Sequence, residues 1–303
     1  MTLQELRYLV AVAEHRHFGR AADACNVTQP TLSAQVRKLE SYLGMTLIDR
    51  TSKQPVPTPI GAQIVERAQR LLAEADDILV LTRQRRGPLQ GALNVGLIPT
   101  LAPYFLPWLL GELRTRYPRL HLVVHEDTTR RLEEKLAERL LDAAFVALPA
   151  GVPGGDLIEC ALFDEPFFVA CPLDHPIAAE ESVSAEHLID LPLMLLTEGH
   201  CLRGQALAAC GQSEASQDDA ADCRATSLET LRQLVTAGLG CTLLPALAVR
   251  HLGHADMVVR PLASRECRRV GLVWPRMHAK SNELQRLANS LKEVVPPGAQ
   301  PLH

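Results

Sequence analysis

The 303-residue sequence lacks the features that mark several common classes of protein. It has no run of about 18 apolar residues, so we expect no membrane-spanning helix. Its eight cysteines show no Cys-x-x-Cys spacing, which argues against a structural zinc site. The first residues are charged throughout, unlike a secretory signal peptide. We therefore expect a cytoplasmic protein without a metal or another cofactor, whose cysteines are mostly free thiols.

The sequence also lacks a net positive charge, but its charges are unevenly distributed. The formal net charge is −4. Residues 1–58 carry seven Lys or Arg and five Asp or Glu, which gives 7 − 5 = +2 and leaves −4 − 2 = −6 for the remainder. This asymmetry is a weak indication that the N-terminal part meets a polyanion such as nucleic acid.

Cys201 and Cys210 bracket a segment of strong helix formers that is followed by Gly211, a favourable helix C-cap. In a helix, the nine steps between them rise about 13.5 Å and turn about 900°, so the sulfurs leave opposite sides. A disulfide needs Cα atoms about 4.4–6.8 Å apart, so this helix must unwind before they bond. Cys201 is the better nucleophile, because a helix N-terminus, His200 and Arg203 all favour its thiolate. The alternative is two ordinary small residues of a core.

Residues 1–58 predict a winged helix-turn-helix domain. Apolar residues recur with a helical period over 3–15, and further helices fit 19–25 and 30–43, before a short hairpin at 45–58. The third helix presents small polar side chains followed by two cations, which suits the major groove of DNA. The alternative is a generic three-helix module with solvated cations. The DNA-binding residues that we predict are Gln29, Pro30, Thr31, Ser33, Arg37, Lys38 and Arg50.

Residues 59–88 predict a long linker helix that ends before Gly87 and Pro88. Two parallel rows of apolar residues run along this helix, one with spacings of three and four residues and the other with spacings of seven residues. They are Val65, Ala68, Leu72, Ala75 and Leu79, and Ile64, Leu71 and Ile78. The rows predict a homo-oligomer, a dimer or a tetramer, that offers two recognition helices to two half-sites. Packing of this helix on its own domain is the alternative.

From residue 89 to 303 strands and helices alternate, which predicts an α/β regulatory domain with a mostly parallel sheet. Ligands in such folds bind in a cleft at the carboxyl ends of the strands. We expect a capping box at Thr226 and Glu229 to open one helix, and the Pro-rich tail from Pro296 to be disordered. The predicted strands are 93–98, 121–125, 143–148, 167–171, 193–196, 241–244 and 269–274, and the predicted helices include 129–140, 201–210 and 282–294.

Five motifs carry a resemblance to a known family. They are His200–Gln205 with Cys210 after it, Arg224–Arg232, Leu243–Val249, Gln29–Ser33 and Phe18–Ala22. The chain resembles, over nearly its whole length, the OxyR-like peroxide-sensing members of the LysR-type transcriptional regulators. Gly204 departs from the pattern, because the family usually carries Asp there. A glycine weakens a helix by up to about 1 kcal/mol, so we expect it to ease disulfide formation.

The resemblance implies a periplasmic-binding-protein-like regulatory domain of two α/β subdomains. One is expected at about 89–163 with 268–295, and the other at about 164–267, with crossings near 162–166 and 264–269. It also implies a regulator rather than an enzyme, which binds double-stranded promoter DNA, acts with RNA polymerase and controls antioxidant genes in response to hydrogen peroxide.

The resemblance further implies the chemistry of the cleft. The Cys201 thiolate attacks peroxide, and Cys210 resolves the sulfenic acid to a disulfide, which melts the helix and changes the dimer interface. The peroxide-binding residues that it implies are Thr100, Thr129, His200, Arg203, Gln205, Arg268 and Arg269. Thr100 and Thr129 could instead only cap helices.

Two other functions compete with this one. A LysR-type regulator could bind a small metabolite in the same cleft, with incidental cysteines. A thiol peroxidase could use the same cysteine pair, but it would not need residues 1–58 or the linker helix. The other six cysteines are interpreted as spectators, although a side disulfide under strong oxidation stays open.

Overall fold

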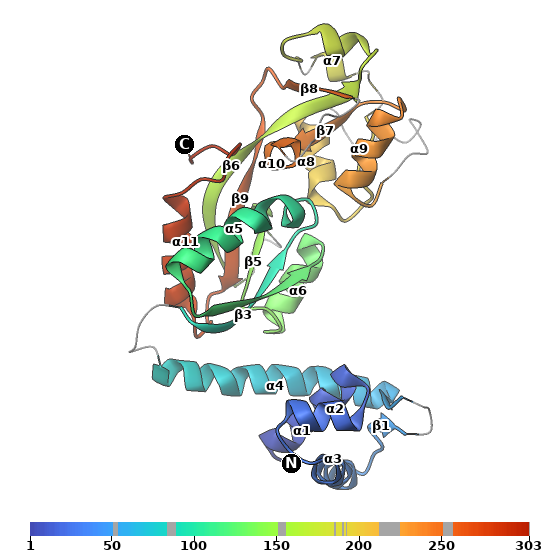
Figure 1. The fold of residues 1–303 in the computed structure, drawn as a ribbon, viewed down its shortest axis with the longest axis vertical. Coiled ribbons are helices and arrows are strands. Elements are labelled where there is room, and N and C mark those ends of the chain that lie inside the picture. The colour runs from blue at the N-terminus through green and yellow to red at the C-terminus, as the bar shows by residue number, and fades with distance from the viewer. Residues whose placement is uncertain are drawn as a thin grey trace. The chain divides into compact units, whose positions relative to one another are not determined.

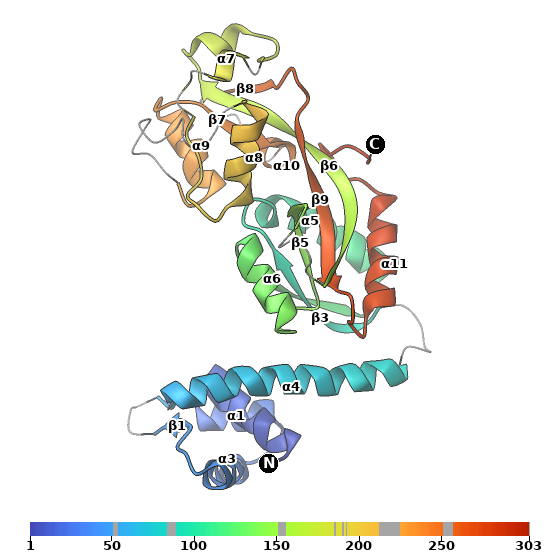
Figure 2. The ribbon, with the colours of Figure 1, turned by 180° about the vertical axis from the view of Figure 1, so that it is seen from behind.

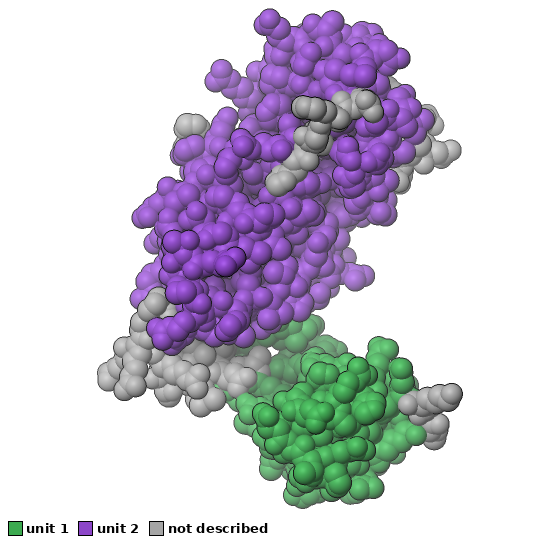
Figure 3. Space-filling view, in the orientation of Figure 1, with its two compact units in different colours: residues 1–86, 138–140 green, residues 87–137, 141–303 purple. Residues whose placement is uncertain are grey.

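The structure is a computed structural model that describes residues 1–302 except 51–53, 84–88, 151–155, 185, 190, 192, 212–224 and 251–256. It contains two compact units (Figure 3). The first comprises residues 1–86 with 138–140, and the second comprises residues 87–137 with 141–303. Among the described residues, no helix is long and apolar enough to cross a membrane.

The first unit begins with three helices and a two-stranded hairpin, which confirms the predicted winged helix-turn-helix (Figure 1). A capping box starts the first helix, because Thr2 accepts from the Glu5 amide and Glu5 accepts from the Thr2 amide. Gly44 adopts the left-handed conformation that ends the third helix. The elements are α1 (Leu3–His15), α2 (Phe18–Ala24), α3 (Gln29–Leu43), β1 (Ile48–Asp49), β2 (Val56–Pro57) and α4 (Pro59–Arg83).

Helix α4 packs on the domain that precedes it. Gly61 lies so close to the hairpin that an added Cβ would be 2.0 Å from the Leu47 carbonyl oxygen. Ala68 is fully buried, and Val65 and Leu72 pack against the same core, so one predicted oligomer row is partly used within the chain. Leu71, from the other row, is 49% exposed and remains open to a partner. The side chains of residues 78 and 79 lie outside the described residues.

The second unit contains the predicted alternation of strands and helices, with several differences. The strands are β3 (Gly91–Leu97), β4 (Leu120–Glu126), β5 (Ala143–Leu148), β6 (Leu157–Pro172), β7 (Thr242–Pro245), β8 (Met257–Pro261) and β9 (Cys267–Pro275). The helices are α5 (Ala102–Arg116), α6 (Thr129–Ala137), α7 (Glu186–Ile189), α8 (Cys201–Ala209), α9 (Leu228–Thr236), α10 (Ala246–Arg250) and α11 (Ser281–Lys292), with a 3-10 turn at Pro176–Ala179.

The sheet of this unit is mixed, so the prediction of a mostly parallel sheet was wrong. The strand order is β4-β3-β5-β9-β6-β7, and β8 pairs with β6. Among the described strands, β3 alone makes parallel ladders, with β4 and β5, whereas β9 runs antiparallel to β5 and β6. The long strand β6 runs through both halves of the unit (Figures 1 and 2), pairing with β9 in the first half and with β7 and β8 in the second, which the alternation of short elements did not reveal.

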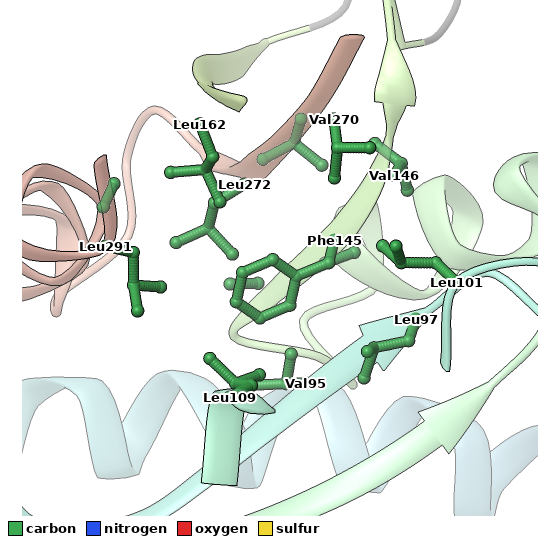
Figure 4. Packing of buried hydrophobic residues seen from close by; sticks show 14 of the residues in the cluster. Val95, Leu97, Leu101, Leu109, Phe145, Val146, Leu162, Val270, Leu272 and Leu291 are labelled. Atoms are coloured by element: carbon green, nitrogen blue, oxygen red, sulfur yellow. The ribbon is translucent and has the colours of Figure 1, made fainter. Parts of the chain in front are cut away.

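Two hydrophobic cores lie along this long strand, which confirms two subdomains. In the first core, under α5, α6 and α11, the Phe105 ring contacts those of Phe145 and Phe163, with centroid distances of 5.2 and 5.6 Å. Figure 4 shows Phe145 among the aliphatic side chains of this core. The second lies between α8, α9 and the β6–β7 strands. Tyr104 packs against both cores, so they meet at this point of the chain.

Three local predictions in this unit were wrong. Leu193 and Leu196 make isolated bridges to Cys241 and Ala225, so residues 193–196 are buried without forming a strand.

The predicted capping box is replaced by Ser227, whose hydroxyl accepts from the Thr230 amide, because Glu229 instead pairs with Arg232. The tail is not disordered, because Asp164 and Gln300 exchange two backbone hydrogen bonds of 3.0 and 2.7 Å.

Candidate functional site

The cysteine helix α8 starts at Cys201 and has Cys210 as its C-cap, which confirms the predicted helix. Both cysteines are free thiols. Leu202, Leu207 and Cys210 belong to the second core, whereas Cys201 packs against the first. The helix is therefore anchored in one subdomain while its first thiol touches the other.

A small pocket adjoins Cys201. It forms where the end of β3, the start of α6 and the turn before α8 meet, and Gly199 makes that turn with a φ of +92°. The lining residues are Ile98, Pro99, Thr100, Thr128, Thr129, Gly199, His200 and Cys201. The fold thus brings together four of the predicted site residues, from three segments that are separated in the chain by about 30 to 100 residues.

Thr100 is bound by Arg268, which forms a buried ion pair with Glu165. Arg268 donates from Nη1 to the Thr100 hydroxyl at 2.8 Å and from Nη2 to its carbonyl oxygen at 3.1 Å. Its Nε donates to Glu165 at 2.8 Å, and Glu165 also accepts from the Leu247 amide at 2.8 Å. Because the Thr100 hydroxyl accepts from Arg268, its own proton is free to be donated into the pocket. Thr100 therefore does not cap α5, whose N-cap is Leu101.

Two buried oxygen atoms of this region have no hydrogen-bond partner within the described part of the chain, namely Thr129 Oγ1 and Gln205 Oε1. Buried polar groups are nearly always paired in folded proteins, so such atoms point to a small polar guest. Thr129 lines the pocket and caps nothing through its side chain. Gln205 follows Cys201 by four positions, about 400° along the helix, and so leaves α8 on nearly the same side.

Two predicted residues lie elsewhere. Arg203 follows Cys201 by about 200° of helical turn and lines a separate cavity beneath α8, with its Nη1 3.5 Å from the Leu196 carbonyl oxygen. Arg269 is 47% exposed and pairs with Asp164 at 2.8 Å. His200 lines the pocket, but burial lowers its pKa below its ordinary 6.5, so its imidazole is neutral at pH 7. These contacts give no support to the prediction that His200 and Arg203 favour the thiolate, which stays a prediction.

The second cysteine of this segment is protected in this state. Cys210 is fully buried, and burial raises its pKa to about 12. It is a neutral thiol at physiological pH, which makes it a poor nucleophile while it stays buried.

Helix α3 displays the predicted DNA-contacting side chains on its outer face. Gln29, Pro30 and Thr31 are exposed at its start. Lys38 pairs with Glu5 at 3.1 Å. Arg50 pairs with Glu40 at 2.7 Å and lies over the Phe18 ring. The exposed cation Arg37 makes no ion pair with any residue that the structure describes.

The sequence analysis missed Thr128 and Glu165. Thr128 precedes a predicted site residue and had no signal of its own. Asp164 and Glu165 are adjacent acids among the apolar residues of β6, and a buried acid requires a cation. That pattern could have assigned them to the adjacent arginines, Arg268 and Arg269. In the described residues no group of three or more His, Cys, Asp or Glu could hold a metal ion.

Comparison with known proteins places the chain in one family. Residues 3–62 match the model for the bacterial regulatory helix-turn-helix protein, lysR family, and residues 86–296 match the LysR substrate binding domain. The DNA-binding transcriptional dual regulator OxyR of Escherichia coli K12 is 42% identical over 294 residues, covering 96% of this chain and 95% of the relative. A probable hydrogen peroxide-inducible genes activator of Mycobacterium avium is 41% identical, covering 97% and 94%.

Comparison with solved structures indicates the same family. A full-length OxyR variant from Pseudomonas aeruginosa matches with a TM-score of 0.76 and 39% identity, covering 99% of this chain and 97% of that one. A Corynebacterium glutamicum OxyR mutant in the H2O2-bound form matches with a TM-score of 0.66 and 36% identity, covering 96% and 92%. The chain therefore belongs to the LysR family of helix-turn-helix transcriptional regulators, as an OxyR-like member.

Proposed function

We propose that this regulator senses hydrogen peroxide through Cys201 and Cys210. The observation that carries the proposal is the pocket beside Cys201, in which one threonine hydroxyl is oriented by Arg268 and another is buried without a partner among the described residues. The relatives that are named as hydrogen peroxide-inducible genes activators, and the related structure in its H2O2-bound form, support the same assignment.

The first step is nucleophilic attack. The Cys201 thiolate attacks one peroxide oxygen, the O–O bond breaks, and the leaving hydroxide takes a proton to become water. The hydroxyls of Thr100, whose proton is free, and of Thr129, whose oxygen lacks a partner in the described structure, donate to the peroxide and stabilise the leaving hydroxide, and Gln205 Oε1 accepts a hydrogen bond from the bound peroxide. Sulfur is oxidised to a sulfenic acid and peroxide oxygen is reduced to water.

The second step changes the fold. Cys210 attacks the sulfenic sulfur and a second water leaves, but helix α8 holds the two sulfurs on opposite sides and about 13.5 Å apart along its axis. Bonding therefore requires α8 to unwind. Cys201 also leaves the first core while Cys210 leaves the second, so the contact of α8 with both subdomains changes.

The output is a change in DNA binding. We assign DNA contact to the outer face of α3 and to Arg50, in a homo-oligomer that reads two half-sites. Helix α4, with Leu71 exposed, supports a partner helix there. In this proposal the protein acts in the cytoplasm with RNA polymerase on antioxidant genes, without catalytic turnover of peroxide.

The size of the pocket argues against a metabolite effector. The pocket leaves about 0 Å³ for the centre of a water-sized molecule, so a bulky metabolite could enter only after large movements of the surrounding side chains. A peroxide molecule, which is little larger than water, needs only a small adjustment. Membership of a family of transcriptional regulators argues against a thiol peroxidase.

The test is a thiol count with a peptide map after one equivalent of hydrogen peroxide. We expect the wild type to lose two thiols and to join Cys201 to Cys210. The Cys201→Ser variant should lose none, and the Cys210→Ser variant should stop at a sulfenic acid on Cys201. Equal thiol loss in both variants and in the wild type would remove the sensor assignment.

A further inference from the structure

Two other cysteines of the second subdomain lie opposite each other. Strands β6 and β7 are antiparallel, with Phe167 opposite Pro245 and Ala170 opposite Thr242. One more residue along this register places Cys171, near the end of β6, opposite Cys241, which directly precedes β7. Both thiols are free.

The register also determines whether this residue pair is hydrogen-bonded or non-hydrogen-bonded. Pro245 has no backbone N–H, so Phe167 and Pro245 cannot be a pair that exchanges two hydrogen bonds. The two types alternate along an antiparallel ladder, so Cys171 and Cys241, four steps away, also form a non-hydrogen-bonded pair. Such pairs have Cα atoms about 4.5 Å apart and closely spaced side chains, within the range of about 4.4–6.8 Å for a disulfide.

Both thiols are buried in a core to which α8 also contributes. Cys171 is 0% exposed and Cys241 is 2% exposed, in the same core as Leu202, Leu207 and Cys210 of α8. Burial raises the pKa of both thiols, and the neighbouring Cys171 adds to burial in raising the pKa of Cys241 to about 11. Peroxide reacts with exposed thiolates, so neither thiol is reactive in this state.

We propose that Cys171 and Cys241 are a second dithiol, which peroxide oxidises to a cross-strand disulfide once the Cys201–Cys210 disulfide has removed α8 from their shared core. This inference rests on the proposed function, because loss of α8 from the core is what exposes the pair. A second molecule of peroxide supplies the oxidising equivalents.

The second reaction balances in the same way as the first. One cysteine sulfur takes an oxygen from peroxide, the O–O bond breaks and one water leaves. The other sulfur attacks the sulfenic acid, forms the S–S bond and releases a second water. Two thiols are oxidised for each peroxide reduced, so the fully oxidised protein has lost four thiols.

The pair lies where a crosslink would affect the sensor segment. The Cys241 carbonyl oxygen accepts from the Met194 amide at 2.8 Å, and the Thr242 hydroxyl donates to the Met194 carbonyl oxygen at 2.6 Å. Residues 193–200 connect this contact to Cys201. The second disulfide would therefore crosslink β6 to the residue that binds Met194, in the segment that leads to α8. It would form only at a larger dose of oxidant.

The experiment titrates the reduced full-length protein with hydrogen peroxide, blocks the remaining thiols by alkylation and maps the crosslinked peptides without reduction. At one equivalent we expect only the Cys201–Cys210 link. At a large excess we expect the Cys171–Cys241 link as well. In Cys201→Ser, which cannot start the first reaction, the second link should form at least about tenfold more slowly, because the core stays closed.

Two variants complete the test. Cys171→Ala should keep the first link and lose the second, whereas Cys160→Ala, which removes another buried thiol in the first core, should keep both. The inference is overturned if the wild type forms Cys201–Cys210 but never Cys171–Cys241, while the proposed function stands. It is also overturned if Cys201→Ser forms the second link as fast as the wild type, or if Cys171 joins Cys210. Absence of the Cys201–Cys210 link at every dose would instead remove the proposed function.

Discussion

At the scale of single residues, a substitution of Thr129 should affect the reaction with peroxide without affecting the stability of the fold. Its hydroxyl oxygen is buried beside Cys201 and has no partner in the described structure, so a nearly isosteric valine removes no hydrogen bond of the reduced state. We expect Thr129→Val to leave the free energy of unfolding within about 0.5 kcal/mol of the wild type. Oxidation of Cys201 should slow about 10- to 100-fold, because a donor to the leaving oxygen is lost.

The measurement is the rate of thiol loss by stopped-flow mixing with peroxide, alongside chemical denaturation. Thr100→Val is the informative contrast, because it also removes the acceptor of Nη1 of the buried Arg268 and should lower stability as well as the rate. If Thr129→Val oxidises as fast as the wild type, this hydroxyl does not contact peroxide.

The contacts of Asp142 predict how the stability of the fold depends on pH. It lies at the end of the first core, where it accepts from Lys280 at 2.9 Å, from the Asn94 amide at 2.7 Å and from His278 Nε2 at 3.3 Å. Burial alone would raise its pKa, but the hydrogen bond from His278 and the charge and hydrogen bond of Lys280 outweigh burial and lower the pKa below its ordinary 3.8. The ionised carboxylate is therefore the stabilising form.

A carboxyl group whose pKa is lower in the folded protein than in the unfolded protein stabilises the fold at pH values above the unfolded pKa. The contribution of Asp142 is fully present well above pH 3.8 and disappears as the pH falls below 3.8 through the folded pKa. Asp142→Asn should cost about 2–3 kcal/mol at pH 7 and progressively less below pH 3.8. Tryptophan fluorescence in urea reports this directly, because Trp108 and Trp274 both pack in the first core. A difference that does not depend on pH would contradict the ion-pair interpretation.

At the scale of elements, helix α8 has to be stable enough to protect Cys210 and weak enough to melt. Gly204 is exposed in the middle of this helix, and an added Cβ would meet no atom within 4 Å. Gly204→Ala should therefore stabilise the helix by up to about 1 kcal/mol. Because α8 must unwind before the disulfide forms, this variant should join Cys201 to Cys210 up to about fivefold more slowly.

The matched control is Ala208→Gly, which changes another exposed position of the same helix in the opposite sense. It should form the disulfide faster by a similar factor. Quenched-flow mass spectrometry separates the sulfenic acid from the disulfide, and only the second step should change. If both variants close the bond at the wild-type rate, unwinding of α8 does not limit the reaction.

At the scale of the whole molecule, the output is DNA affinity. Arg37 is exposed on α3 and makes no ion pair with the described residues, whereas neighbouring Lys38 already pairs with Glu5. Arg37→Ala should weaken promoter binding and reduce the slope of log K against log salt concentration by about 1, because one phosphate contact and its released counterion are lost. Lys38→Ala should weaken binding less, because binding DNA must compete with Glu5.

The control is Arg130→Ala, which removes the same charge from the second unit, where the side chain is 89% exposed. It should leave affinity and slope unchanged. Fluorescence anisotropy of a labelled promoter fragment at several salt concentrations gives both quantities. A variant of Arg37 with unaltered affinity and slope would move the recognition face elsewhere.

The sequence by itself determined the elements and the cysteine spacing. Periodicity placed α1, α3, α8 and β5 within a residue or two, because local propensity and apolar spacing are properties of neighbouring residues. The first part of β6, residues 157–166, was missed, because β6 is a single strand shared by two subdomains. Its length depends on partners distant in the chain.

Only the tertiary structure decided which candidates form the site. Arg268 and Arg269 are adjacent in sequence, but successive residues of a strand face opposite sides, so one holds Thr100 and the other, which is half-exposed, pairs with Asp164. Helical rotation separates Cys201 from Arg203 on α8, and the antiparallel register of β6 and β7 extends to place Cys171 opposite Cys241. A pocket is made by contacts between distant segments, and spacing along the chain carries no direct record of those contacts.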